Sequence, residues 1–459
     1  MLKNASKINK NTALQYIFTY LFVLFLSTTP IGTVLSMYKS NQQTYGDQPP
    51  SYDYYQENFL RYGDFVYADN IKTVVFHKKG FDLSPPLIRF GSQEKLILRF
   101  DDLDADYKNY SYTIIHCNAD WQPSRLRNYE YIDGFYDDQI RDYQFSINTL
   151  VDYTHYKIEL PNRNMQPKVS GNYILKVYLD NDPDNVVLTR KFKVNEQLVG
   201  IEGAVRQANR VVYRDEMQEV NFTINTSTYR ISNAYQDLKV SIKQNGRTDN
   251  LIWDLKPSLV MGTKLIYEYE DKNLFDGGNE FRRLDLRTLR YPTERVSDIT
   301  GTHTHWEVHL LRDQRRSARR YTFEEDINGR FNINNYDGQD SYVDADYAYV
   351  HFRLDYNIPE QYGNFYIIGA LTDWNYTADN RMKYSFRDKE YYLTLLLKQG
   401  YYNYMYVFLE DGESKGKTFR TEGNHSETEN DYTIYVYHRK PGNLYDSLIG
   451  VLHLNSAVK

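Results

Sequence analysis

The sequence predicts an all-β chain of about three tandem antiparallel β-sandwich domains behind an N-terminal signal peptide. Tyrosine accounts for 46 of the 459 residues, and tyrosine favours strands and half-buried surfaces. Many short segments alternate apolar and polar residues and are separated by turn residues, and no long amphipathic helical stretch follows the signal region. A length of 459 residues predicts about three domains on a prior of roughly 150 residues each.

Residues 1–36 have the layout of a secretory signal peptide. Lysines at positions 3, 7 and 10 precede an apolar run from Tyr16 to Leu26, and smaller, turn-forming residues follow up to Ser36. A membrane anchor is the alternative, but Pro30, Gly32 and two threonines interrupt the run. We therefore expect an exported protein, with residues 37–60, which show no clear period and contain a Pro-Pro pair, as a flexible arm.

The first sandwich is expected over residues 61–195. Its clearest hairpin runs from Tyr173 to Val194, where Tyr173, Leu175 and Val177 share one face and a turn follows at residues 181–184. The return strand alternates in the same way. This pattern predicts one face in the core and one face in water.

Two further sandwiches are expected over residues 196–345 and 346–459. In the middle stretch, apolar and polar residues alternate over 220–225 and 238–243, and an Asn-Gly turn follows the second of these segments. In the last stretch, residues 350–356 alternate, and Gly turns flank a strand over 401–409. Short strands at regular spacing are typical of sandwich domains.

Composition limits the function. The chain has 55 Lys and Arg against 61 Asp and Glu, a formal net charge of −6, which is not the electrostatic footprint of a nucleic-acid-binding protein. Cys117 is the only cysteine, so no intramolecular disulfide can form and packing must stabilise the fold. We expect the exported protein to be soluble or peripherally bound.

The aspartates of the first domain resemble a calcium loop only in part. Asp102, Asp104 and Asp106 have the opening spacing of an EF-hand, but Tyr107 stands where the loop needs glycine and Thr113 where it needs a bidentate glutamate. The aspartates over 180–184 fail in the same way. Both segments are interpreted as solvated loops.

Other candidate sites are equally incomplete. His303, His305 and His309 lack a supporting Glu or Cys ligand at a useful spacing, and Cys117 and His116 are adjacent strand residues that point to opposite faces. The glycine-rich segment 412–418 has three residues between its glycines, whereas a phosphate-binding loop needs four. We expect no catalytic residue, no cofactor and no metal, and hence a protein that is not an enzyme.

A cluster of arginines is the strongest candidate contact surface. The segment RDQRRSARR at residues 312–320 holds five arginines, whose planar guanidinium groups recognise carboxylates and phosphates. Arg315, Arg316, Arg319 and Arg320 are candidate contacts for an acidic partner or for lipid headgroups. The alternative is a solvated hairpin.

One stretch of the first domain carries a family resemblance. The strings DDLDADYKNYSYTIIHCNADWQPS (101–124), DGFYDDQIRDYQFSINTLVDYTHYKIELP (133–161) and GNYILKVYLDNDPDNVVLTRKFKV (171–194), with NDYTIYVYHRKPGNLYDSLIG (430–450) near the C-terminus, resemble the plug proteins of the type IX secretion system of the Bacteroidota. The resemblance implies a periplasmic protein, associated with the inner side of the outer membrane, that binds the large translocon barrel. Such a protein would seal the barrel's periplasmic opening when no cargo is in transit.

The last domain carries a second resemblance. FYIIGALTDWN (365–375), RMKY (381–384) and GYYNYMYVFLEDG (400–412) are similar to early-set β-sandwiches of glycogen-binding modules, and Trp374 stands where these modules stack a sugar. Met405, however, replaces a sugar-contacting lysine. The resemblance implies the fold, and it leaves open an alternative function as a carbohydrate-binding protein of a glycan-uptake system.

Overall fold

A computed structural model describes residues 60–457, and the predicted signal peptide and all but the last residue of the predicted arm lie outside this range. Within it the chain is all-β, as predicted: the strands form seven sheets, and each α-helix has four residues. Pairing is antiparallel except between β12 and β3 and between β21 and β23. No helix among these residues is long and apolar enough to cross a membrane.

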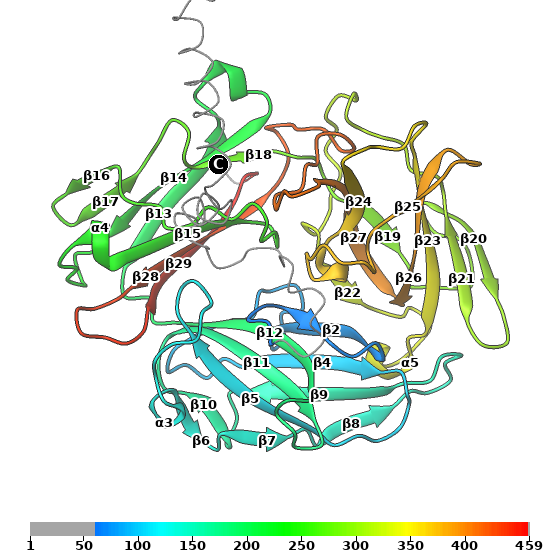
Figure 1. Cartoon of the computed structure of the whole chain (residues 1–459), viewed down its shortest axis with the longest axis horizontal. Coiled ribbons are helices and arrows are strands. Elements are labelled where there is room, and N and C mark those ends of the chain that lie inside the picture. Colours follow the sequence, from blue (N-terminus) through cyan, green and yellow to red (C-terminus); the bar gives the residue numbers. More distant parts are fainter. Residues whose placement is uncertain (1–59, 458–459) are drawn as a thin grey trace, which may run out of the picture. The chain divides into compact units, whose positions relative to one another are not determined.

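The N-terminal sandwich consists of two main sheets and a short two-stranded sheet (Figure 1). The first sheet has the order β1-β12-β11-β5-β7, with β3 beside β12; its strands are β1 (Phe65–Val66), β3 (Leu87–Arg89), β5 (Tyr110–Cys117), β7 (Asp137–Gln139), β11 (Gly171–Leu179) and β12 (Val186–Asn195). The second has the order β2-β4-β9-β8, from β2 (Ile71–Lys78), β4 (Leu96–Asp102), β8 (Asp142–Phe145) and β9 (Thr154–Leu160). Helix α3 (Asn128–Tyr131) precedes β6 (Ile132–Gly134), which pairs with β10 (Met165–Pro167).

The hairpin that the sequence predicts is β11 and β12. Tyr173, Leu175 and Val177 are fully buried and share one cluster with Leu98 and Tyr156 of the second sheet. The inner face of the hairpin is therefore core, as the alternation predicts.

The outer face of β11 is also buried, and the prediction that it lies in water is wrong. Asn172 and Ile174 are both 0% exposed. Trp121 and Cys117 cover Ile174, and the Tyr437 hydroxyl of a later strand donates a 2.8 Å hydrogen bond to Asn172 Oδ1. A two-residue period shows that the faces differ, but it cannot show that a distant part of the chain covers the second face.

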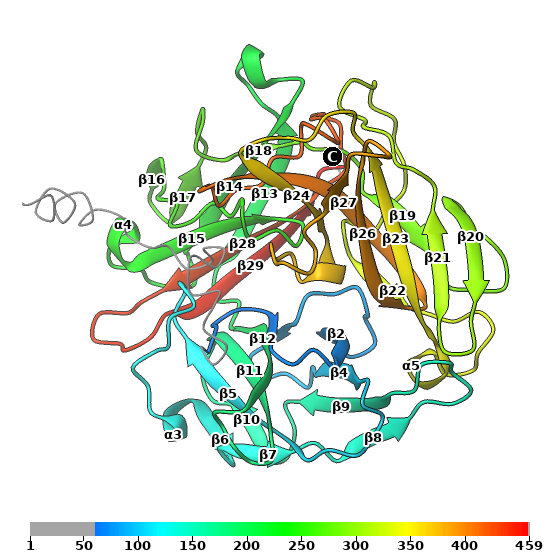
Figure 2. The same cartoon turned by 45° about the vertical axis from the view of Figure 1, so that its right-hand side comes forward.

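The second sandwich packs a five-stranded sheet on a three-stranded sheet. The larger has the order β13-β14-β17-β16, with β18 beside β14; its strands are β13 (Gly200–Gln207), β14 (Met217–Asn225), β16 (Leu259–Met261), β17 (Lys264–Tyr267) and β18 (Leu274–Asp276), and its turns include η2 (Val211–Tyr213) and α4 (Ala234–Asp237). The smaller has the order β15-β28-β29, from β15 (Leu238–Gln244), β28 (Asp431–His438) and β29 (Ser447–Asn455). Figure 2 shows the two C-terminal strands, in red, beside the green β15.

The third sandwich is formed by the chain between β18 and β28. One sheet has the order β19-β27-β22 with β24 beside β27, from β19 (Arg282–Asp285), β22 (Phe331–Ile333), β24 (Gly363–Ile368) and β27 (Gly400–Glu410). The other has the order β20-β21-β23-β26-β25, from β20 (Val296–Gly301), β21 (Trp306–Leu310), β23 (Tyr347–Asp355), β25 (Lys383–Ser385) and β26 (Glu390–Lys398). Helix α5 (Ser341–Asp344) precedes β23, and η3 (Ala370–Thr372) follows β24.

The strand pairing crosses the expected boundary at residue 345. Strands β19 to β22 lie in the middle stretch but pair with strands of the third sandwich, and β28 and β29 lie in the last stretch but pair with β15. Two separate buried clusters follow the same division. We propose domains at about 61–195, 200–276 with 431–455, and 279–427. The expected boundary at 345 differs because a sequence pattern locates strands but does not show which strands pair.

Replacing Ile434 by alanine tests this division. Ile434 is 0% exposed and pairs with Ile242 of β15, so its truncation should lower the free energy of unfolding by about 2–5 kcal/mol and speed amide exchange in β15. Chemical denaturation and hydrogen exchange measure the two effects. The neighbouring Thr433→Ala, on the other face, should change stability by less than about 0.5 kcal/mol. Faster exchange confined to β23, β26 and β27 would contradict the division.

Candidate functional site at the junctions of the three sandwiches

A buried carboxylate joins the first sandwich to the third. Asp101, in β4, is 0% exposed, and its oxygens accept hydrogen bonds from Lys398 Nζ at 2.6 Å, Tyr347 Oη at 2.7 Å and His155 Nδ1 at 2.6 Å. Lys398 ends β26, and its side chain is also 0% exposed, 3.9 Å from the centre of the Tyr153 ring. Two of these donors, the Lys398 ammonium and the Tyr347 hydroxyl, come from the third sandwich, so the Asp101 carboxylate bonds across the junction.

The ionised state of Asp101 follows from these contacts. Burial alone raises the pKa of the carboxyl, but the Lys398 ammonium and the His155 imidazole outweigh burial and hold the pKa below its usual range. Backbone contacts extend the junction, since the Asp346 carboxylate accepts hydrogen bonds from the amides of Leu150 and Val151 at 2.7 and 3.1 Å.

A second contact between the same two sandwiches lies at η3. Arg190 of β12 is 5% exposed and forms a 3.0 Å ion pair with Asp373, which has a left-handed φ of 52°. Burial raises the pKa of the Asp373 carboxyl, although the Arg190 guanidinium opposes this effect. The Asn375 amide donates to the backbone carbonyl of Asp64 at 2.9 Å.

The first and second sandwiches meet around Asp446. Its carboxylate is 1% exposed and accepts hydrogen bonds from Arg439 at 2.7 Å, Lys239 at 3.1 Å and the Ala119 amide at 3.1 Å. Arg439 also donates to Asn118 Oδ1 at 2.9 Å. The loop after β5 is therefore fixed on the C-terminal hairpin.

The second and third sandwiches meet around Asp249. Arg247 of the second sandwich forms a bidentate pair with it, and Tyr376 Oη and the Gly416 amide of the third sandwich donate to it at 2.6 and 2.9 Å. Arg330 and Asp431 form a further ion pair of 2.6 Å across this junction. Each of the three domain pairs is thus fixed by at least one carboxylate with several donors.

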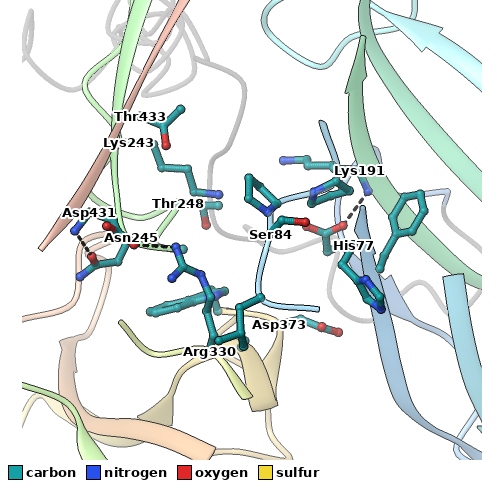
Figure 3. A pocket seen from close by; sticks show the side chains of 18 of the residues that line it. His77, Ser84, Lys191, Lys243, Asn245, Thr248, Arg330, Asp373, Asp431 and Thr433 are labelled. Carbon is teal, nitrogen blue, oxygen red and sulfur yellow. Dashed lines mark hydrogen bonds and ion pairs between the residues drawn. The ribbon is translucent and has the colours of Figure 1, made fainter. Parts of the chain in front are cut away.

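A cavity of about 520 Å³ lies where the three sandwiches meet. Figure 3 shows Lys191, Lys243 and Arg330 on its walls with Asp373 and Asp431. The two carboxylates are held by Arg190 and Arg330, respectively. The cavity therefore presents charges of both signs, of which Asp373, Arg330 and Asp431 take part in the junctions.

The predicted arginine surface divides into two kinds of residue. Arg316 is half-buried and pairs with the buried Glu422 at 2.9 Å, so it belongs to the interior network. Arg319 and Arg320 are exposed, and Arg315 is exposed with its guanidinium 4.7 Å from the centre of the Tyr356 ring. Partner contact by these three remains a prediction.

Trp374, the predicted sugar-stacking residue, is half-buried in the second–third junction. The Gly246 and Gly329 backbones lie so close that a Cβ on either would stand 2.1 or 2.3 Å from the indole, and the Phe281 ring packs at its edge at 5.9 Å. One part of the indole also borders the central cavity. Its packing role accounts for the tryptophan, and sugar stacking stays a prediction.

The remaining sequence candidates are accounted for by their contacts. Lys108 pairs with Asp102, Asp104 and Asp106, so an ammonium stands among the carboxylates of the supposed calcium loop. Cys117 is buried, and burial raises the pKa of its thiol. Glu307 accepts hydrogen bonds from His305 and His351, and no group of three or more potential ligands within residues 60–457 is arranged to hold a metal ion.

The sequence patterns did not predict the residues that form the junctions. Asp101 stands next to the aspartates considered for calcium, but its partner Lys398 is 297 residues away. One signal was available: Asp101 and Lys398 are charged residues at the ends of strongly apolar strands, where a solvated turn is the ordinary expectation.

The Lys398→Met variant tests the strength of the first junction. It leaves Asp101 buried without its cation, so the free energy of unfolding should fall by about 3–5 kcal/mol, measured by chemical denaturation. The matched control is Lys79→Met, which breaks the more exposed pair with Glu159 and should cost less than about 1 kcal/mol. Equal losses in the two variants would contradict the inference that the buried Asp101 depends on Lys398.

The Glu422 carboxylate predicts a specific acid sensitivity. Burial raises its pKa, but Arg282 and Arg316 lower it to about 2, from an ordinary value of 4.5. Because the unfolded chain binds this proton more tightly, the stabilisation is complete above about pH 4.5 and is lost as the pH falls toward 2, on the order of 3 kcal/mol in all. Unfolding free energies from pH 6 to 2.5 should fall less steeply in Glu422→Gln; an identical slope would contradict the assignment.

Two comparisons with known proteins found matches to this chain. A family model described as the type 9 secretion system plug protein 1st domain matches residues 71–196, from the start of β2 to just beyond β12. The chain is similar to a hypothetical protein from Parabacteroides merdae ATCC 43184, whose crystal structure superposes with a TM-score of 0.84. The two sequences are 36% identical, and the alignment covers 86% of this chain and 100% of that one. No curated protein matches the chain. The chain belongs to the plug protein family of the type IX secretion system.

Proposed function

We propose that this protein is a non-enzymatic plug subunit of the type IX translocon, which sterically seals the periplasmic opening of the outer-membrane barrel when no cargo is in transit. The match of residues 71–196 to the plug domain carries the proposal. The expected partner is the translocon barrel, and the expected location is the periplasm, on the inner side of the outer membrane.

The junctions supply the mechanical property that this role needs. A plug blocks a pore only if its domains do not separate under load. Asp101, Asp249 and Asp446 each hold one pair of sandwiches together through several donors, in places where water cannot compete. Removing one partner from such a group is costly, so hinge opening at any junction is disfavoured.

The chemistry of the cavity is consistent with a steric role. Two of its carboxylates, Asp373 and Asp431, are paired with Arg190 and Arg330, and Asp82 lies 3.5 Å from His77. Since the Trp374 indole is packed on Gly246 and Gly329, no specific contact favours the carbohydrate-binding alternative.

Purification of the tagged protein from cell membranes tests the partner. It should recover the translocon barrel, and deletion of the gene should make cells sensitive to a large antibiotic that the outer membrane normally excludes. Deletion of the barrel as well should remove this sensitivity, because the leak passes through the open barrel. Failure to recover the barrel, or a leak that persists without the barrel, would overturn the proposal.

A further inference from the structure

Two segments of the chain cross between the second and third sandwiches. The first, residues 277–281, leads from β18 to β19, and the second, residues 427–430, leads from β27 to β28 (Figure 1). Hydrogen bonds join the two segments: Thr428 Oγ1 donates to the Gly278 carbonyl at 3.1 Å, and Asn430 Nδ2 donates to the Gly277 carbonyl at 2.9 Å. A hinge motion between these two sandwiches would therefore act on the two crossing segments.

Three carboxylates, Glu280, Asp326 and Glu429, meet at this crossing and form an acidic cluster. Glu280 and Glu429 belong to the two segments, and the Glu429 amide donates to Glu280 Oε1 at 3.1 Å. Asp326 of the third sandwich accepts the amide of Phe281, the residue next to Glu280. Glu280 is 0% exposed. Because like charges shielded from water repel one another strongly, the three carboxylates cannot all be ionised at low cost.

No cation neutralises this cluster. Within residues 60–457 none of its three members forms an ion pair. Arg316 donates to the Glu280 backbone carbonyl at 2.6 Å, but its ionic partner is Glu422. The side-chain donors to the cluster are neutral: Tyr321 Oη donates to Glu280 Oε1, and the amides of Asn328 and Asn455 donate to Glu429 Oε1. A proton is therefore the group that can reduce the negative charge.

The free oxygen of Glu280 is the position that suits this proton. Both oxygens of Asp326 accept backbone amides, from Phe281 and from Asn328, and such donors favour the ionised form. Glu280 Oε1 has two donors, whereas Oε2 is buried and has no hydrogen-bond partner in the described part of the chain. Burial, with the charges of Glu280 and Glu429, raises the pKa of Asp326 to about 7, and burial raises the pKa of Glu280. The closed cluster thus retains one proton up to about neutral pH.

Other charged and titratable groups face the cluster from three sides. They are Tyr321, Tyr401 and Arg316 of the third sandwich, Glu427 of the second segment with His425 just before it, and Asp431 of β28, which pairs with Arg330. Among these side-chain types, histidine is the one that ordinarily titrates between pH 5 and 8. His425, whose ring lies 5.7 Å from that of Tyr321, therefore needs its own variant in the test.

We propose that the acidic cluster is a pH-dependent switch on the hinge between the second and third sandwiches. With a proton on Glu280 Oε2 the two crossing segments stay joined, and without it the three carboxylates repel one another and favour separation of the segments. The inference does not depend on the sealing role.

The direction of the pH dependence follows from the two states of the hinge. When the hinge opens, water reaches the carboxylates and their pKa values return to about 4. Because the raised pKa belongs to the closed state, the closed state binds the proton more tightly and opening releases it. The hinge is therefore most firmly closed in acid below about pH 4; opening becomes easier as the pH rises to about 7, with no further change above that value.

Amide hydrogen exchange at pH 5.5 and at pH 7.5, corrected for the intrinsic exchange rate, tests the switch in the full-length exported protein. Protection of the two crossing segments should be about twentyfold weaker at pH 7.5, because the opening equilibrium changes about tenfold for each pH unit between the two pKa values. Protection of β11, in the first sandwich, should change by less than about threefold.

Glu280→Gln imitates the protonated cluster. Glutamine keeps Oε1 for its two donors and replaces Oε2 by a neutral amide nitrogen, so protection of the crossing segments should differ by less than about threefold between the two pH values. Should this variant not fold, Glu429→Gln decides. It removes one charge from the cluster, which lowers the pKa of the closed state and should reduce the change in protection to about fivefold.

The matched control is Glu427→Gln, which removes one charge from the same segment at an exposed position outside the cluster. This variant and His425→Gln should both keep the full change in protection. Near-UV circular dichroism shows which variants are folded. The inference is overturned if the crossing segments of the unchanged protein are equally protected at both pH values, or if the cluster variants keep the full change. It is also overturned if Glu427→Gln or His425→Gln abolishes the change.

Discussion

Asp101 is a carboxylate removed from water, and the junction between the first and third sandwiches depends on satisfying its charge. In a medium of low dielectric constant an unpaired carboxylate would be protonated or would draw water into the joint. Lys398, Tyr347 and His155 prevent both, but Lys398 and Tyr347 belong to the third sandwich and can do so only while the two sandwiches keep their present positions. The pair therefore contributes positional specificity more than net stability, because desolvation of both ions offsets much of their attraction.

The path of the chain reinforces this constraint. The chain leaves the second sandwich after β18, builds the whole third sandwich, and returns at β28 to complete the second. Two covalent connections thus cross one junction, and Asp249 ties the same junction through Arg247 and Tyr376. Rotation of the third sandwich against the second would have to break this group and strain both connections. A chain with a single cysteine thereby obtains rigidity that many extracellular proteins obtain from disulfides.

The sequence allowed the strands to be predicted far better than the way they pair. Alternation located β11, β14, β15 and β23 because each has one face in a core, which is a local property. The pairing of β28 with β15 is set by contacts between residues about 190 apart, and no local pattern records it. The same limit explains the misjudged outer face of β11. Arg316 looked like a surface residue for a related reason: its partner Glu422 lies 106 positions further along the chain.

Tyrosine shows most clearly why composition alone misleads. An abundance of tyrosine favours sheets with wet faces, yet of the twelve largest fully buried side chains among the described residues, eleven are tyrosines. Their hydroxyls explain this. Tyr404 and Tyr406 both donate to Asp313, at 2.8 and 2.7 Å, while their rings fill the core of the third sandwich. Phenylalanines could fill the same space, but with both hydroxyls gone Asp313 Oδ2 would lose its donors while Oδ1 kept Arg282, and a buried acceptor without a donor costs about 1–3 kcal/mol. Tyrosine hydroxyls likewise donate to Asp101 and Asp249 at the junctions, so buried tyrosines supply donors to buried carboxylates that phenylalanine could not.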